Sequence, residues 1–312
     1  MPATPIRSPI RTVIRSLLRS LTRSPISPLG LLLIFAVSTS GVSCDRGEFP
    51  LYAQLGDLRV LTIKAVSNAE VNPGATVTLQ PVISDLNGGG RQLNVIVQTC
   101  VDPGLSLGAV PVCAAPDSTS NSSFSASTLG ANNTYTGEAP PFTVNVPPLT
   151  LAAPTDRYNG VNYLVIYTVT SGDGASTVTS FKRILVSDPG KTGKNQNPAF
   201  SGVTSNGVSL TASSASASNV NPYSSAVATL QPSFSVGAEQ YQWMNPDGTF
   251  IPRTELLATT WFYTDGSTQY QRTSDTDVNQ WTPARVSTRG VALVAVVRDG
   301  RGGEDYQIFQ FN

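Results

Sequence analysis

The residues of this chain that could do chemistry are few, and its three cysteines are the most informative of them. They are Cys44, Cys100 and Cys113, and the 312 residues contain no histidine. Without histidine there is no Ser-His-Asp or Cys-His nucleophile and no imidazole ligand for a metal ion. The chain also lacks the GxSxG, SxxK and phosphate-loop patterns. The sequence therefore predicts a protein that is not an enzyme and that holds no cofactor and no metal.

Cys44 follows a segment with the layout of an export signal. Five arginines lie in the first 28 residues, the apolar run 29–37 follows, and small residues then lead to Cys44. Nine apolar residues suit the h-region of a signal peptide, whereas a membrane span needs about 20. We therefore expect residues 1–43 to be a signal peptide, with its n-region over 1–28.

The run Gly41-Val42-Ser43-Cys44 resembles the lipobox of bacterial lipoproteins. In that family the cysteine becomes the first mature residue and carries a diacylglycerol and an acyl chain, and several chains together anchor stably. Gly41 departs from the leucine that is usual in the family. Two alternatives stay open: an ordinary signal peptidase that leaves a free thiol on Cys44, and an organellar transit peptide.

The lipobox resemblance implies an exported protein that is attached to the cell envelope, with residues 44–57 as a tether. We expect the outer membrane to hold the lipid, although the resemblance does not decide which membrane it is. Its first partner is then the membrane, through the lipid on Cys44. Beyond the five N-terminal arginines, 15 basic groups face 20 acidic groups, with no basic stripe. Because nucleic-acid binding needs clustered Lys and Arg, we expect no nucleic-acid partner.

The other two cysteines are separated by 12 residues. An exported chain meets an oxidising compartment, so Cys100 and Cys113 are expected to form a disulfide. A metal site is disfavoured, because the pair has neither CxxC spacing nor a histidine beside it.

The body of the chain is expected to be all-β. Short runs that alternate apolar and polar residues are separated by clusters of Gly, Pro, Asn, Asp and Ser, which is the pattern of a sandwich or barrel. One such run is Thr76-Val77-Thr78-Leu79-Gln80. The other expected strands are 58–66, 93–100, 142–146, 161–170, 176–186, 226–232, 241–243, 256–263, 291–298 and 306–311.

An internal repeat predicts two tandem immunoglobulin-like β-sandwiches. Val77-Thr78-Leu79-Gln80-Pro81 recurs as Ala228-Thr229-Leu230-Gln231-Pro232, each after a Val-Asn-Pro, and each half ends in a strand, a Gly/Asp turn and a last strand. Each half has the size of an immunoglobulin-like sandwich. The expected division is a first domain over 58–187 with a Ser/Asn-rich insertion at 114–139, a linker over 188–198, and a second domain over 199–312.

The body resembles bacterial cell-envelope lipoproteins with tandem Ig-like or PKD-like modules. The residues that carry this resemblance are the opening 71–79, Trp261-Phe262-Tyr263, the stretch 279–283 and the closing 294–303. The resemblance implies an extracytoplasmic location, β-sandwiches and no catalysis, and it implies no particular ligand.

Aromatic residues of the second half are the candidate binding residues: Trp243, Trp281 and Tyr270. Tryptophan and tyrosine are favoured at binding surfaces, although Trp261 or Trp243 could instead fill the core of a sandwich. Two acidic loops, 275–279 and 299–305, lack the full spacing of a calcium loop, and we interpret the second as a hairpin turn.

The function expected from the sequence is that of a non-catalytic, lipid-anchored envelope protein with a structural, adhesive or protein-binding role. Its second partner would be another envelope protein or a glycan. The alternatives are a carbohydrate-binding surface module, a carboxylate-based hydrolase and a passive spacer.

The lipid anchor is tested by the intact mass of the membrane-extracted protein beside a Cys44→Ala variant. We expect a mature chain that starts at Cys44 and carries a diacylglycerol and an acyl chain, and a variant that is released or unprocessed. An unmodified chain cut near Ser40 would contradict the anchor.

Overall fold

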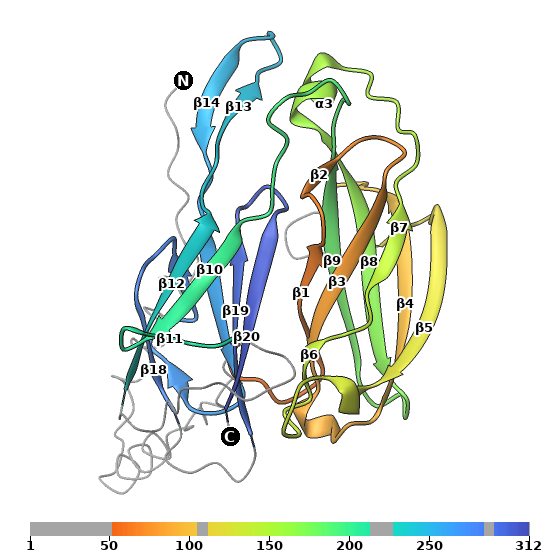
Figure 1. The fold of residues 1–312 in the computed structure, drawn as a ribbon. Helices are drawn as coiled ribbons and strands as arrows, with labels where there is room; N and C mark the ends of the chain where they lie inside the picture. Colours follow the sequence, from red (N-terminus) through yellow and green to blue (C-terminus); the bar gives the residue numbers. More distant parts are fainter. Residues whose placement is uncertain (1–51, 105–111, 213–226, 284–289, 312) are drawn as a thin grey trace, which may run out of the picture. The chain divides into compact units, whose positions relative to one another are not determined.

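The chain folds into two β-sandwiches that follow one another along the sequence (Figure 1). The computed structural model describes residues 52–104, 112–212, 227–283 and 290–311. This architecture confirms the expected all-β class with tandem immunoglobulin-like sandwiches. The expected signal peptide and Cys44 lie outside the described residues. Within the described ranges, no helix has the length and apolar content that a bilayer span requires.

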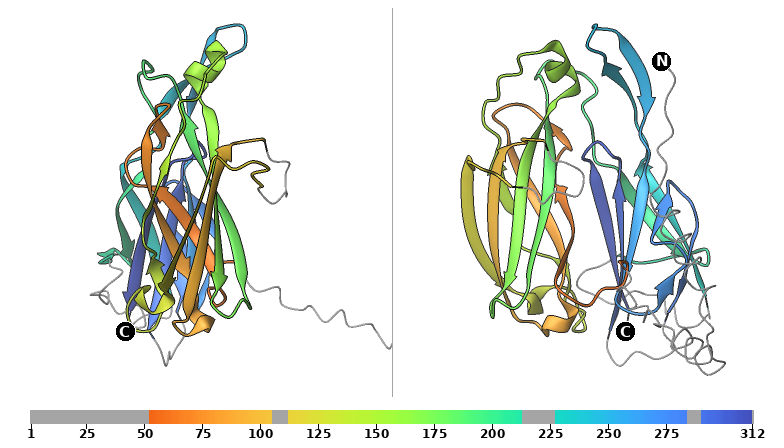
Figure 2. Two further views of the ribbon diagram at one scale, coloured as in Figure 1. Left: turned by 90° about the vertical axis from the view of Figure 1, so that its right-hand side faces the viewer. Right: turned by 180° about the vertical axis from the view of Figure 1, so that it is seen from behind.

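The first sandwich is built from strands between residues 59 and 186. One sheet consists of β1 (Arg59–Ala65), β3 (Thr76–Ser84), β6 (Thr136–Glu138) and β7 (Phe142–Asn145), with β3 in the centre. The other has the order β2-β9-β8-β4-β5, made of β2 (Glu70–Val71), β9 (Thr177–Val186), β8 (Val161–Ser171), β4 (Gln92–Val101) and β5 (Ser118–Ser125). The short β2 pairs in parallel with the last strand, β9, while the other pairs are antiparallel. Strand β5 therefore forms the outer edge of this sheet (Figures 1 and 2).

The second sandwich is built from strands between residues 199 and 311. One sheet has the order β11-β10-β12-β18-β16, made of β11 (Val208–Ser209), β10 (Ala199–Ser205), β12 (Ala228–Val236), β18 (Asn279–Thr282) and β16 (Ser267–Thr268). The facing sheet has the order β17-β15-β19-β20, made of β17 (Arg272–Ser274), β15 (Ala258–Tyr263), β19 (Val291–Arg298) and β20 (Glu304–Phe311). A separate hairpin arm consists of β13 (Gln240–Met244) and β14 (Phe250–Thr254).

The repeated Thr-Leu-Gln-Pro motif occupies the same place in both sandwiches. It lies on β3 in the first and on β12 in the second, and each of these strands pairs with neighbours on both sides. Leu79 and Leu230 are fully buried in the two separate apolar cores. The motif recurs because its alternating pattern supplies one inward leucine to the central strand of each sheet.

The stretch 114–139, expected to be an insertion, contributes the two strands β5 and β6 as well as core residues. Strand β5 pairs with β4 along eight successive positions, from Ser118 to Ser125. Just beyond it, Ala126 and Leu129 are fully buried. The sequence pattern missed β5 because backbone pairing to a neighbouring strand needs no apolar side chain.

Residues just before the first strand pack against the second sandwich. Ala53 is fully buried in the second core, and Leu55 is buried in a third apolar cluster. The amide of Leu55 donates to the carbonyl of Tyr263 at 2.7 Å, and the amide of Tyr263 donates to Ala53 at 3.0 Å. The described part of the expected tether, residues 52–57, is therefore bonded to the end of β15 at Tyr263.

The two sandwiches meet in one compact unit, Leu51–Asn312. Apolar residues of both contribute to the third cluster, which contains Leu55, Leu61, Val82, Phe262, Val294, Val296 and Ile308. Beside it lies a buried ion pair between Lys182 of β9 and Glu304 of β20, and the hydroxyl of Thr62 donates to the same carboxylate. Lys64 pairs with Asp305 at 2.6 Å on the same side.

The expected linker, 188–198, is held in place by polar contacts. Lys191 pairs at 2.6 Å with the fully buried Glu70, and the amide of Asn195 donates to the second oxygen of that carboxylate at 2.8 Å. The side chain of Asn195 then donates to Asp299 in the turn before β20, at 3.0 Å. The linker thus ties β2 of the first sandwich to the second.

The pair Lys182–Glu304 predicts a specific dependence of stability on pH. Burial alone would raise the pKa of Glu304. The positive charges of Lys182 and Arg298 lower it by more than burial raises it, so the pKa lies below its ordinary value of 4.5. Its contribution is complete above pH 4.5 and is lost as the pH falls through the lowered pKa. Glu304→Gln should cost about 3 kcal/mol at neutral pH, because Lys182 loses its partner, and less in acid.

Urea unfolding across this pH range measures the difference in free energy. The matched control is Asp277→Asn, an exposed carboxylate that makes no ion pair among the described residues, and it should change stability by less than about 0.5 kcal/mol. A deficit for Glu304→Gln that stays constant down to the lowest pH would contradict the assignment.

Candidate functional site

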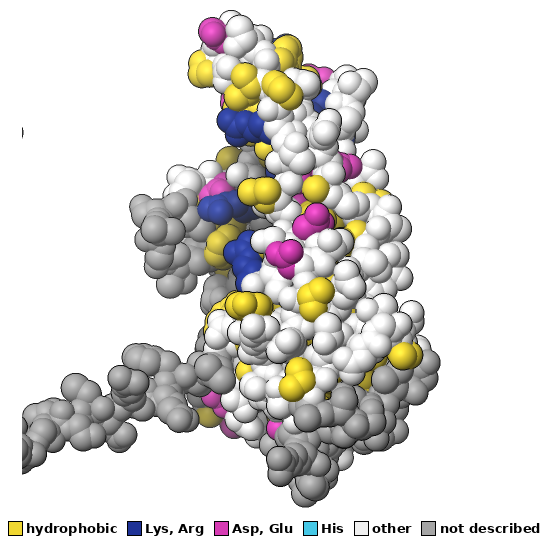
Figure 3. Space-filling model, turned by 90° about the vertical axis from the view of Figure 1, so that its left-hand side faces the viewer, with side chains coloured by type: hydrophobic (Ala, Val, Ile, Leu, Met, Phe, Trp, Pro, Cys, Tyr) yellow, Lys and Arg dark blue, Asp and Glu magenta, His cyan; other side chains and the backbone are white. Residues whose placement is uncertain are grey.

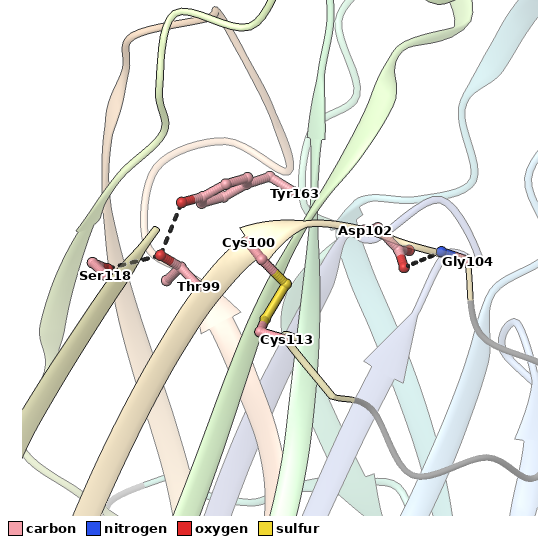
Figure 4. The surroundings of a disulfide bond; sticks show 7 residues. All are labelled: Thr99, Cys100, Asp102, Gly104, Cys113, Ser118 and Tyr163. Atoms are coloured by element: carbon pink, nitrogen blue, oxygen red, sulfur yellow. Dashed lines mark hydrogen bonds between the residues drawn. A yellow bond between two sulfur atoms is a disulfide. The ribbon is translucent and has the colours of Figure 1, made fainter. Parts of the chain in front are cut away.

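The predicted disulfide is present, between Cys100 at the end of β4 and Cys113 (Figure 4). Their Cα atoms lie 5.8 Å apart, and both cysteines pack with Leu164 and Ile166. The hydroxyl of Tyr163 donates to Thr99 at 2.8 Å beside the bond. The disulfide therefore links the end of β4 to the residues that lead into β5, and it acts as a structural staple.

The three candidate binding aromatics lie in different surroundings. Trp281 is fully buried, packs 5.4 Å from the ring of Phe311 and donates to the carbonyl of Asp265 at 3.2 Å. Its candidacy is therefore wrong: alternate residues of β18 point inward, which makes Trp281 a core residue like Trp261. Tyr270 is exposed beyond half of its surface, and Trp243 is half-buried on the hairpin arm.

In the two acidic loops, polar side chains form hydrogen bonds with nearby backbone groups and so fix the turns of the chain. Asp299 accepts hydrogen bonds from the amides of Arg301 at 2.7 Å and Gly303 at 2.9 Å, which closes the turn between β19 and β20. In the other loop, the Asn279 side chain bonds both the amide and the carbonyl of Tyr270. In the described part of the chain, no three Cys, Asp or Glu side chains gather as a metal site would require.

A polar recess that contains a candidate residue is a cleft where the sandwiches meet, and we call it the junction cleft. It has a volume of about 540 Å³, within the range of small-molecule sites. Its walls are β9 and the start of β8 on one side, and the hairpin arm, the end of β19 and the turn before β20 on the other. Trp243 is therefore the one candidate aromatic that lines it.

Most of the charged side chains that line the junction cleft are basic. Its lining contains six basic side chains and a single acidic one, Glu304. The basic residues are Lys182, Arg183, Lys191, Arg253, Arg298 and Arg301. Figure 3 shows one face of the molecule, on which charged side chains are sparse and a few basic ones gather toward one edge. Six basic side chains in the lining of one cleft are an unusual concentration in a chain with only 13% charged residues.

Glu304, which pairs with Lys182 and Arg298, lines the junction cleft, whereas the other carboxylates that balance these cations lie outside its lining. Arg301 pairs with Glu255 at 2.8 Å and lies 3.7 Å from Glu70, whose other partner is Lys191. Burial raises the pKa of Glu255 and of Asp299, which lie nearby. Glu70 and Glu255 therefore offset the positive charge of Lys191 and Arg301 from outside the lining of the cleft.

Two arginines of the junction cleft keep unused donors. Arg183 pairs with Asp102 through Nε at 2.6 Å, and its terminal nitrogens have no partner among the described residues. Arg253 lies 4.7 Å over the ring of Trp243 and makes no ion pair within the described ranges. The amides of Asn162 and Gln242 on the same walls also lack side-chain partners there. The cleft can therefore donate several hydrogen bonds to an anion and to hydroxyl groups.

The aromatic rings of the arm position these arginines. Arg301 lies 3.9 Å over the ring of Tyr241, two residues before Trp243 on the same face of β13. A ring face that a guanidinium covers holds that cation by cation–π attraction and is closed to a sugar ring. Tyr241 and Trp243 therefore act through the arginines that stack on them.

The arm itself is clipped to the first sandwich. The side chain of Asn159, in the short helix α3 (Pro154–Asn159), bonds both backbone groups of Met244, at 2.8 and 2.9 Å. Tyr158 packs edge-on against Phe250 of β14 with ring centroids 4.7 Å apart. This clip fixes the wall of the junction cleft that contains Trp243 and Arg253.

Sequence reasoning missed Arg253 and the arm's second strand, although a signal was present. Asn245-Pro246-Asp247-Gly248 is a turn sequence, and Gly248 adopts a φ of 84° that other residues rarely tolerate. The turn predicts a second strand after it, which would have placed Arg253 opposite the aromatic residues of β13.

Breaking the clip should loosen the arm without unfolding the sandwiches. In Asn159→Ala the amide of Met244 loses its acceptor, so we expect its hydrogen exchange to accelerate roughly tenfold. Asn162→Ala is the control, because the Asn162 side chain makes no hydrogen bond to another described residue. Unchanged exchange at Met244 in Asn159→Ala would show that the side chain does not hold the arm.

Comparison with known proteins yields a distant structural likeness. No protein-family model and no curated protein matches the chain. Among solved structures, it is similar to "Escherichia coli alpha-2-macroglobulin activated by porcine elastase", at 12% sequence identity and a TM-score of 0.24. The likeness covers 84% of this chain and 22% of that chain, so this chain spans less than a quarter of that protein's length.

Proposed function

We propose that this chain is a non-catalytic binding protein, held at the cell envelope by a lipid on Cys44, that binds an acidic glycan in the junction cleft. The observation that carries the proposal is the set of six basic side chains, against one acidic side chain, in a cleft of about 540 Å³. A carboxylate or phosphate group on the glycan would take the unused donors of Arg183 and Arg253.

A glycan fits the junction cleft better than a bare anion does. The free amides of Asn162 and Gln242 line the same walls and can bond sugar hydroxyls. The ring faces that would stack on a neutral sugar are instead covered, by Arg301 over Tyr241 and by Arg253 over Trp243. Recognition would therefore depend on the acidic groups of the glycan more than on stacking.

A binding role also accounts for how the buried carboxylates are used. Glu70 and Glu255 pair with Arg301, and Asp299 accepts backbone amides of its own turn. A glycoside hydrolase needs two carboxylates directed at the scissile bond from an open site. Since these carboxylates are bonded within the walls, the geometry favours binding over hydrolysis.

Binding of oligogalacturonate to the folded protein tests the proposed function, with the methyl-esterified oligomer as the uncharged probe. We expect the acid form to bind, the ester to bind much more weakly, and salt to weaken the acid form. Arg253→Gln and Arg183→Gln should each raise Kd roughly tenfold, because each removes a charged hydrogen bond worth about 1.4 kcal/mol.

The matched control is Arg272→Gln, on β17 outside the cleft, which should leave Kd within about twofold. Equal affinity for acid and ester would overturn the proposal. Equally tight binding of a polyglutamate peptide would assign the cleft to an acidic protein segment and would overturn the glycan.

A further inference from the structure

Strand β5 is an unprotected edge of the first sandwich. It pairs with β4 along its whole length and with no other strand among the described residues. Its eight residues, Ser-Thr-Ser-Asn-Ser-Ser-Phe-Ser, include no charge and no proline. Natural edge strands usually carry such residues, since these discourage pairing with another chain. This edge therefore lacks the usual barrier to an added strand.

The hydrogen-bond pattern shows which backbone groups of β5 face outward. The amide of Ala126 donates to Arg91 at 2.8 Å, which continues the register of β5 with β4. Because bonded and non-bonded pairs alternate in an antiparallel ladder, the even-numbered residues of β5 face β4. The amides and carbonyls of Thr119, Asn121 and Ser123 therefore point away from the sheet and can accept another strand.

A groove runs beside this edge. It has a volume of about 490 Å³ and lies between β5 and the opposite edge strand, β7, with Val97 and Tyr167 among its lining residues. On β5, Ser120 and Ser122 stand opposite the buried Val97 and Val95 of β4, so they share the inward face. The groove exists because small serines occupy positions where a sandwich core normally has apolar residues.

The floor of the groove is aromatic and contains an unused polar group. Phe142 of β7 stacks on Tyr167 of β8 with ring centroids 5.3 Å apart. Only 2% of Tyr167 is exposed, and its hydroxyl has no hydrogen-bond partner among the described residues. Burial raises the pKa of Tyr167, so the hydroxyl stays protonated and free to donate. The hydroxyl can therefore donate a hydrogen bond to a partner that enters the groove.

We propose that β5 and this groove form a docking site for an extended peptide strand of a partner protein, with large apolar side chains at alternate positions. Its backbone would pair with Thr119, Asn121 and Ser123 and extend the sheet. Its inward side chains would fill the groove over Phe142 and Tyr167. This site is separate from the junction cleft, and it does not depend on the acidic-glycan proposal.

A second copy of this chain fits the site less well than a partner strand does. In a β5–β5 pair, Phe124 would be the one large apolar residue on the inward face of each copy, and the groove would again receive serines at 120 and 122. These side chains are too small to fill a groove of about 490 Å³. The occupant must therefore bring large apolar residues at the positions where β5 has serines.

The docking site is tested with an eight-residue peptide that alternates threonine and leucine and has a lysine added at each end. Backbone amide shifts in the full mature protein should change at Thr119, Asn121 and Ser123 on peptide addition. Asn121→Pro removes one outward N–H and no bond to β4, so Kd should rise roughly tenfold. Asn121→Ala is the matched control: it keeps the N–H and should bind like the wild type.

Ser122→Leu gives an independent readout, because it fills the groove and leaves the outward backbone intact. It should weaken peptide binding while the thermal midpoint stays the same or rises. The proposal is overturned if Asn121→Pro binds the peptide like the wild type, or if the shifts lie away from β5 and β7. Self-association that Asn121→Pro abolishes would also overturn it, since a second copy would then occupy the edge.

Discussion

The buried contact between Lys182 and Glu304 is the constraint on which the arrangement of this molecule depends. Lys182 belongs to the first sandwich and Glu304 to the second, and they are 122 residues apart in the chain. Either charge alone would be costly to bury, because only the attraction of an oppositely charged partner offsets the free energy of desolvation. Both groups are therefore satisfied only when the sandwiches are docked, and the lowered pKa of Glu304 reflects this mutual dependence.

The junction cleft is a consequence of that docking. Lys182 and Glu304 both line it, and the turn before β20 adds Arg301 next to them. The linker residue Lys191 and the clip at Asn159 fix the remaining walls. Neither sandwich contains the binding surface by itself, so the proposed ligand would contact residues from both at once. A contact of this kind would also stabilise the docked arrangement, since it exists only in that state.

The two proposed sites would bind their ligands through different interactions, and they lie toward opposite edges of one sheet. In the order β2-β9-β8-β4-β5, the junction cleft contacts β9, whereas the peptide groove follows β5. Charge-assisted hydrogen bonds would govern the cleft, while backbone pairing and apolar burial would govern the groove. The disulfide Cys100–Cys113 secures the end of β4, the strand on which β5 is built. Occupancy of one site leaves the other open.

The amino-acid sequence by itself determined the all-β class, the repeated sandwich and the pairing of Cys100 with Cys113. These follow from alternating patterns, turn residues and a cysteine count, all of which act over short stretches of chain. Only the tertiary structure decided that Trp281 is a core residue, that β5 is an open edge, and that Arg183 and Arg253 share one cleft. Each of these depends on which strands face each other, and such contacts join residues that are far apart in the sequence. The lipid on Cys44 stays a prediction of the sequence alone.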